Sequence, residues 1–211
     1  MKIYGTGTTS KCDKYQKGDL RMYTVNYECL ELFVKPDEGK KGSVLLKNVK
    51  ESTTETKEPK HIYGNWIKFP VSRNTEYEIS TQDCTITFAY LSECENIMEN
   101  GICVLDTTDN YKEMNKEEFL HFIDTPYREQ YHFSPVVNWN NDPNGLCWFK
   151  GYYHLFYQMN PFGQEWNNMY WGHAASKDLV HWTHLPVVLE PQEEILDNLA
   201  IKGGAFSGSA L

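Results

Sequence analysis

The sequence predicts an all-β protein, and three observations support this fold class. Apolar and polar residues alternate over short runs, most clearly at Tyr77 and Ile79 and again from Cys84 to Tyr90. Charged segments poor in apolar residues, such as 35–42 and 51–60, separate these runs and are expected to be loops. Aromatic residues, which suit strands, make up 14% of the chain.

The first 126 residues are expected to form an accessory domain resembling a small antiparallel β-sandwich. The segments with strand character are 20–34, 43–49, 61–71, 75–80 and 84–91. A helix is expected over 115–123, because Asn115 and Glu118 have the spacing of a capping box. Asp124-Thr125-Pro126 ends this helix and marks the domain boundary.

The role of this first domain is open. Tyr63 and Trp66 are either exposed platforms for a sugar or aromatic residues of the sandwich core. We expect them to pack in the core.

The second domain, 127–211, is organised around the stretch from Trp139 to Gly145, in which Asp142 lies among amides and an indole. The residue before a proline is steered toward an extended conformation, and Asn144-Gly145 is expected to turn the chain. Asp142 is then either part of an ordinary surface turn at the mouth of a hairpin or a carboxylate that binds a sugar. Downstream amide and indole side chains, at Gln158 and Trp166, favour the sugar site.

Consecutive strands follow this stretch. The apolar run 146–149 and the run 152–158 are expected to pair through a turn at Lys150-Gly151, and further strands are expected at 171–175 and 181–189. Three or four consecutive antiparallel strands form one blade of a β-propeller. The segment 193–202 is expected to be a loop, and 206–209 to open the next blade.

Five motifs of the second domain resemble, in order, those of glycoside hydrolase family 32, the β-fructosidases. They are Gln130-Tyr131-His132-Phe133-Ser134-Pro135, Trp139-Asn140-Asn141-Asp142-Pro143-Asn144-Gly145, Gln158-Met159-Asn160-Pro161, Trp171-Gly172-His173-Ala174 continuing to Trp182, and Phe206-Ser207-Gly208-Ser209-Ala210. The resemblance covers 127–211 and includes nothing of 1–126.

This resemblance implies the first blade, and the beginning of the second, of a five-bladed propeller that is incomplete in this chain. It also implies hydrolysis of β-fructofuranosyl bonds with retention, in sucrose, sucrose 6-phosphate or fructans, by two carboxyl groups about 5–5.5 Å apart. Asp142 matches the family nucleophile. The residues expected to bind substrate are Trp139, Asn140, Asn141, Gln158, Trp166, Phe206 and Ser207.

The family's acid/base glutamate belongs to a Glu-Cys motif, and the two Glu-Cys pairs of this chain, at Glu28 and Glu93, lie outside the matching region. We therefore expect residues 1–211 alone to hydrolyse nothing. The alternative is a non-catalytic carbohydrate-binding or structural β protein.

Charge argues against some classes of partner, and the resemblance implies a small carbohydrate substrate. The formal net charge of −9 argues against nucleic acid and anionic membrane surfaces. Because no signal-peptide pattern occurs, we expect a cytoplasmic protein whose six cysteines are free thiols. His181 and His184 are three residues apart on an expected strand and face opposite sides, so we expect neither a metal site nor a cofactor.

Overall fold

The computed structural model describes residues 20–24, 26–107, 112–113, 124–129, 131–196 and 204–210. Strands dominate the described residues, and the all-β prediction is confirmed. The helix expected at 115–123 lies outside them. No helix in the described part of the chain is long and apolar enough to cross a membrane.

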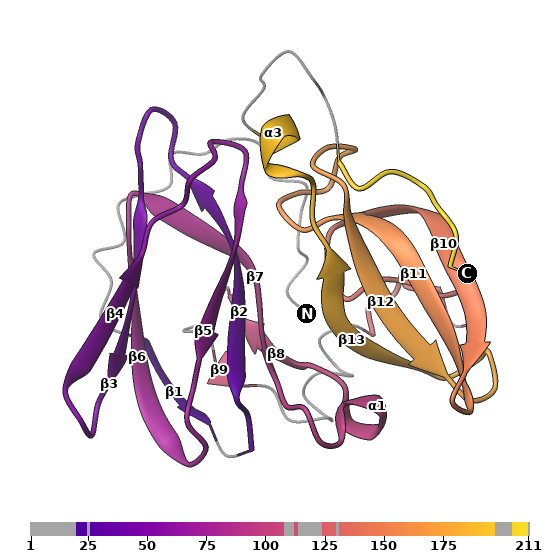
Figure 1. Cartoon of the computed structure of the whole chain (residues 1–211), viewed down its shortest axis with the longest axis horizontal. Coiled ribbons are helices and arrows are strands. Elements are labelled where there is room, and N and C mark those ends of the chain that lie inside the picture. The colour runs from indigo at the N-terminus through magenta and orange to yellow at the C-terminus, as the bar shows by residue number, and fades with distance from the viewer. Residues whose placement is uncertain are drawn as a thin grey trace.

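Two antiparallel sheets form a sandwich in the N-terminal half (Figure 1). One sheet has the order β1-β6-β3-β4 and the other the order β5-β2-β7-β8-β9. Their bounds are β1 Leu20–Thr24, β2 Cys29–Pro36, β3 Ser43–Asn48, β4 Thr53–Lys57, β5 Asn65–Pro70, β6 Thr75–Gln82, β7 Cys84–Ser92, β8 Cys103–Asp106 and β9 Lys112–Glu113. Buried residues of both sheets, including Leu32, Val44 and Phe69, make one core.

Some of these elements differ from those expected from the sequence. The segment 20–34 holds two strands rather than one, and the expected loop 51–60 contains β4. Four of the five residues of β4 are exposed and the strand lies at a sheet edge, so it has no apolar alternation to reveal it. The strands β8 and β9 were not expected.

A third sheet follows, in the chain order β10-β11-β12-β13, with every neighbouring pair antiparallel. The strands are β10 Trp139–Phe149, β11 Tyr152–Asn160, β12 Tyr170–Ser176 and β13 Trp182–Leu189. This four-stranded meander is the expected propeller blade. The one-turn helices α1, Ile97–Asn100, and α3, Glu193–Leu196, complete the described elements, and α3 begins the segment expected to be a loop.

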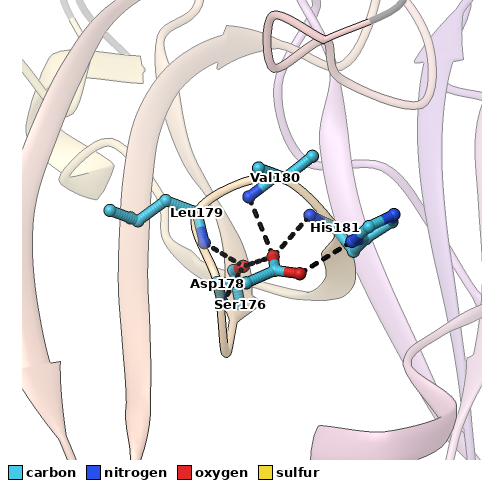
Figure 2. A network of polar contacts seen from close by, with 5 residues as sticks. All are labelled: Ser176, Asp178, Leu179, Val180 and His181. Atoms are coloured by element: carbon cyan, nitrogen blue, oxygen red, sulfur yellow. Dashed lines mark hydrogen bonds and ion pairs between the residues drawn. The ribbon is translucent and has the colours of Figure 1, made fainter.

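The turn between β12 and β13 is closed by Asp178 (Figure 2). Asp178 Oδ1 accepts hydrogen bonds from the backbone N–H groups of Val180, at 2.9 Å, and His181, at 2.8 Å. Ser176 Oγ accepts from the N–H of Leu179 at 2.8 Å, and Asp178 Oδ2 lies 2.7 Å from His181 Nδ1. This turn joins two of the expected strands, and its polar side chains hold the backbone by hydrogen bonds.

The blade packs on the outer face of the five-stranded sheet, so β2 is covered on both sides (Figure 1). Leu32 faces the sandwich core, whereas Phe33 belongs to a second core with Tyr157 and Tyr170 of the blade. A strand covered on both faces is buried at successive residues rather than at alternate ones, as β2 is from Leu30 to Val34. The accessory part and the blade therefore share a hydrophobic core.

Trp66 and Tyr63 do not behave alike. The Trp66 ring stacks on Phe33, with ring centroids 5.7 Å apart, and belongs to the core shared with the blade rather than to the sandwich core. Tyr63 is 38% exposed, so its expected burial is wrong.

Candidate functional site

The Asp142 motif is an irregular strand rather than a turn. β10 runs through the motif and pairs with β11, and its register shifts between Asn140 and Pro143 and again between Asn144 and Cys147. Proline lacks an N–H donor and is tolerated at edge strands and bulges, and Gly145 has the positive φ, +50°, that bulges often require. The expected turn at Asn144-Gly145 is therefore wrong, and the bulges present Asp142 to solvent.

A chain of amide hydrogen bonds runs from β10 to the C-terminal segment 204–210. Trp139 Nε1 donates to Asn141 Oδ1 at 2.9 Å, and Asn141 Nδ2 donates to Gln158 Oε1 at 2.6 Å. Gln158 is buried near the end of β11 and donates through Nε2 to the carbonyl oxygen of Ala205 at 3.3 Å. The two amides are thereby oriented by their neighbours.

Asp142 is paired with the C-terminal segment as well. Ser207 Oγ donates to Asp142 Oδ2 at 2.6 Å. This bond, with a second from the Asn141 side chain, holds the pKa of Asp142 below its ordinary value, because both stabilise the charged form. The backbone bond from Gly145 N to Gly208 O, 3.3 Å, keeps the segment beside β10 (Figure 1). The residues 204–210 contain no strand, so the expected opening of a second blade is not seen within them.

Aromatic side chains gather at the segment 204–210, which binds the carboxylate through Ser207. The rings of Trp166 and Phe206 are nearly parallel, with an interplanar angle of 12° and centroids 6.5 Å apart, and both are about half exposed. Trp171 Nε1 lies 3.0 Å from the carbonyl oxygens of Ala205 and Phe206. Trp171 was missing from the expected site, although it lies opposite Gln158 in the strand register.

The structure thus brings together seven of the eight predicted site residues through contacts with one another or with the segment 204–210. They are Trp139, Asn141, Asp142, Gln158, Trp166, Phe206 and Ser207. Asn140 pairs with Met159 in the strand register, and no side-chain hydrogen bond among the described residues joins it to the others.

Two histidines of the blade, His154 and His173, lie together. His173 Nε2 lies 3.0 Å from His154 Nδ1, and its ring stacks on Phe156. Burial is the main reason that the pKa of His173 is lowered to about 4, and the neighbouring His154 is the second reason. Burial also lowers the pKa of His184 to about 4. His181 is bound to Asp178. Within the described residues, no group of three potential ligands could hold a metal ion.

This arrangement suits a neutral ligand rich in hydroxyl groups. The exposed, ionised carboxylate of Asp142 is hydrogen-bonded to the side chain of Asn141, whose amide can bridge hydroxyls and is held in place by the buried Gln158. The exposed rings of Trp166 and Phe206 can stack on apolar surfaces. Among the described residues, no disulfide joins the cysteines, which are Cys29, Cys84, Cys94, Cys103 and Cys147.

Comparison with known proteins gives consistent matches. Residues 132–211 match the model of the glycosyl hydrolases family 32 N-terminal domain. A levanase of Bacillus subtilis is 56% identical over 90 residues, which are 43% of this chain, and an extracellular exo-inulinase of Aspergillus niger is 64% identical over 66 residues, or 31% of it. In each case the match spans 12% of the relative.

A solved structure covers nearly the whole chain. A glycoside hydrolase family 32 protein from Bifidobacterium adolescentis superposes with a TM-score of 0.82 and 35% identity. It covers 92% of this chain, and this chain covers 31% of it. The N-terminal sandwich and its placement against the blade therefore recur in a solved structure.

Proposed function

We propose that this chain, which belongs to glycoside hydrolase family 32, supplies the nucleophile and part of the sugar pocket of a retaining hydrolase of β-fructofuranosyl bonds. The chain spans less than a third of the solved relative, so the proposal concerns the complete gene product. The observation that supports it most is that Asp142, the carboxylate of the family motif, is kept ionised by hydrogen bonds from Ser207 and Asn141.

In the proposed reaction, an Asp142 carboxylate oxygen attacks C2 of the fructosyl unit while the bond from C2 to the leaving oxygen breaks. A second carboxyl group protonates that oxygen, and water then releases fructose from the covalent intermediate. A lowered pKa keeps Asp142 in the attacking form into mildly acidic solution. The Ser207 hydroxyl, which donates to Oδ2, leaves Oδ1 for the attack.

The pocket is proposed to recognise the sugar by its hydroxyl groups and ring faces. Asn141 and Gln158 are oriented for hydrogen bonding, and Trp166 and Phe206 offer exposed rings. Sucrose, sucrose 6-phosphate and fructans all carry the required fructosyl unit. The names of the two relatives, a levanase and an exo-inulinase, support a fructan among these substrates.

The acid is proposed to come from outside this cluster. The causes of the pKa shift of Asp142 are hydrogen bonds and burial, with no second carboxylate of the described residues among them. General acid catalysis contributes about 10²–10⁴-fold, so we propose that residues 1–211 alone release no measurable fructose from sucrose or inulin. Turnover by residues 1–211 that Asp142→Asn abolishes would contradict this.

The proposed function is tested by Asp142→Asn in the complete gene product. We expect kcat for fructose release to fall by at least about 10³-fold with the fold retained, because an amide cannot form the covalent intermediate. Asp37→Asn, the same change at an exposed carboxylate of the sandwich, serves as the matched control and should keep full activity. Nuclear magnetic resonance of the first product should show the β-anomer.

More than about a tenth of the wild-type kcat in Asp142→Asn would remove the nucleophile role from this residue. Sugar binding without turnover in the wild-type protein would instead support a non-catalytic carbohydrate-binding protein.

A further inference from the structure

We infer that the N-terminal sandwich positions the Trp166 indole and thereby sets the affinity of the site for its sugar. The inference rests on the proposed function, because it assigns Trp166 to the substrate. It concerns two segments. Residues 161–169, which join β11 to β12, are called the Trp166 loop, and residues 60–65, which lead into β5 of the sandwich, are called the Asn65 loop.

The Asn65 loop is a stiff turn built around one buried side chain. Asn65 Oδ1 accepts hydrogen bonds from the backbone N–H of Lys60, at 2.7 Å, and of His61, at 3.0 Å. Its Nδ2 donates to the carbonyl oxygen of His61 at 2.7 Å. Asn65 is 7% exposed, so these bonds are shielded from competing water. The position of Tyr63 and Gly64 therefore depends on Asn65.

The Asn65 loop holds the far end of the Trp166 loop by a hydrogen bond. Asn168, two residues after Trp166, donates through Nδ2 to the carbonyl oxygen of Tyr63 at 3.1 Å. Asn168 is buried and has φ +42°, a left-handed conformation that asparagine tolerates better than most residues. A buried amide in this conformation is stabilised by its partner in the sandwich.

The Asn65 loop also packs against the start of the Trp166 loop. A Cβ atom on Gly64 would come within 2.5 Å of the Phe162 ring, and Gly64 has φ +146°, which other residues rarely adopt. The Phe162 ring in turn packs edge-on against Phe33, at 5.9 Å, and Tyr170, at 5.7 Å. Glycine at this position lets the sandwich backbone lie directly on the Trp166 loop.

Further contacts hold the backbone just before Trp166. Asn160 Nδ2 donates to the carbonyl oxygen of Glu165 at 2.9 Å, and the Thr87 hydroxyl of β7 lies 2.9 Å from the carbonyl oxygen of Pro161. The backbone is thus held on both sides of Trp166, while 46% of the side chain stays exposed beside Phe206. Without the Asn65 loop, the side of Trp166 toward β12 would be held only from Met169 onward, where the Met169 carbonyl oxygen accepts a hydrogen bond from the N–H of Ala205 at 2.6 Å.

Because the Trp166 loop is already held before the sugar binds, less conformational entropy is lost on binding. An indole that contacts the sugar similarly in the ground state and the transition state affects binding of both alike, which changes KM and leaves kcat unchanged. Loss of the Asn65 loop should therefore raise KM selectively.

The test compares Asn65→Ala with wild type in the complete gene product, with sucrose and inulin as substrates. We expect KM to rise about two- to tenfold, the change that corresponds to ordering one side chain on binding, while kcat changes less than twofold. Asn48→Ala is the matched control, since Asn48 is also a buried asparagine of the sandwich, 8% exposed, whose Oδ1 accepts from the N–H of Glu51 in a turn. Asn48→Ala should leave KM unchanged.

A double-mutant cycle separates positioning from a general loss of structure. In a Trp166→Ala background, Asn65→Ala should raise KM no further, because its effect acts through the missing indole. Asn168→Gly removes the hydrogen bond from Asn168 to the Tyr63 carbonyl oxygen and permits the left-handed backbone. It should reproduce the KM change and supplies the test if Asn65→Ala does not fold.

An unchanged KM in Asn65→Ala and Asn168→Gly, an equal effect of Asn48→Ala, or additive effects with Trp166→Ala would each overturn the inference. If the wild-type protein showed no turnover, the proposed function would be contradicted instead. Calorimetric titration with a fructo-oligosaccharide would then compare the affinities of wild type and Asn65→Ala, with weaker binding expected in the variant.

Discussion

Ser207 is the residue on which the ionisation of Asp142 depends most, because its hydroxyl donates to Oδ2 at 2.6 Å. Ser207→Ala should raise the pKa of Asp142 toward its ordinary value, about 3.9. The carboxylate would then become protonated at a higher pH, so the acid limb of kcat/KM should move to higher pH. The measurement is the pH profile of kcat/KM in the complete gene product.

Ser209→Ala, at an exposed serine two residues further along the same segment, provides the comparison and should leave the acid limb in place. An acid limb that Ser207→Ala leaves unmoved would mean that Asp142 does not control it.

At the scale of single residues, sequence motifs predicted most of the residues that the structure brings together. The motifs that resemble the family contain the polar residues expected to act on the sugar, and for this reason they predicted Asn141, Asp142 and Gln158. Trp171 was missed because its role depends on lying opposite Gln158 across two strands, and strand register is not visible in a motif. Asn140 was predicted from its place in the motif, and successive strand residues such as Asn140 and Asn141 point to opposite faces.

At the scale of elements, the turn between β12 and β13 depends on ionised Asp178. His181 and the backbone N–H groups of His181 and Val180 bind this carboxylate and hold its pKa well below the ordinary value. A carboxylate whose folded pKa is depressed stabilises the fold above its unfolded pKa and loses this contribution as pH falls toward the folded pKa.

Asp178→Asn should therefore lower the Tm of the protein at pH 7. The difference in Tm from wild type should shrink below about pH 4, where Asp178 of the unfolded wild type becomes protonated. Thermal unfolding followed by circular dichroism at several pH values measures this. Asp83→Asn, at another exposed turn aspartate, should show no such pH-dependent difference. A difference in Tm that is constant with pH would exclude the charge of Asp178 as the cause.

Strands whose apolar residues lie on one face were predictable because these residues alternate, as Tyr77 and Ile79 do in β6. The motif around Asp142 was not, since Asp, Pro, Asn and Gly are favoured both in turns and in bulges. Only the pairing of β10 with β11 on both sides of the motif decides between these conformations. β4 escaped prediction for a related reason, because an exposed edge strand has no apolar face.

For the whole molecule, the sequence indicated two β-rich parts but not that they share a core. Phe33 has the same apolar character as Leu32, and sequence alone does not reveal that it contacts a different domain. Tyr90 adds a polar link, because its hydroxyl donates to Glu31 Oε2 and accepts from the N–H of Val187 in the blade, both at 3.0 Å. The domain boundary at residue 126 and the cytoplasmic localisation stay predictions.

A shared core predicts that the sandwich and the blade lose stability together. Phe33 is fully buried, stacks on Trp66 and Phe88, and contacts Phe162 and Tyr170 of the blade side edge-on. Phe33→Ala removes this ring and should cost about 3–5 kcal/mol. Because the ring joins both parts, hydrogen exchange measured by mass spectrometry should become faster in β7 of the sandwich and also in β11 and β12.

Leu32→Ala is the matched comparison, since Leu32 precedes Phe33 on the same strand and its side chain faces the sandwich core. It should cost a similar free energy, about 2–5 kcal/mol, and speed exchange chiefly within the sandwich strands. If Phe33→Ala sped exchange in the sandwich alone, the aromatic contacts would not couple the two parts. Coupling would then have to depend on polar links such as the one from Tyr90 to Val187, which Tyr90→Phe would remove.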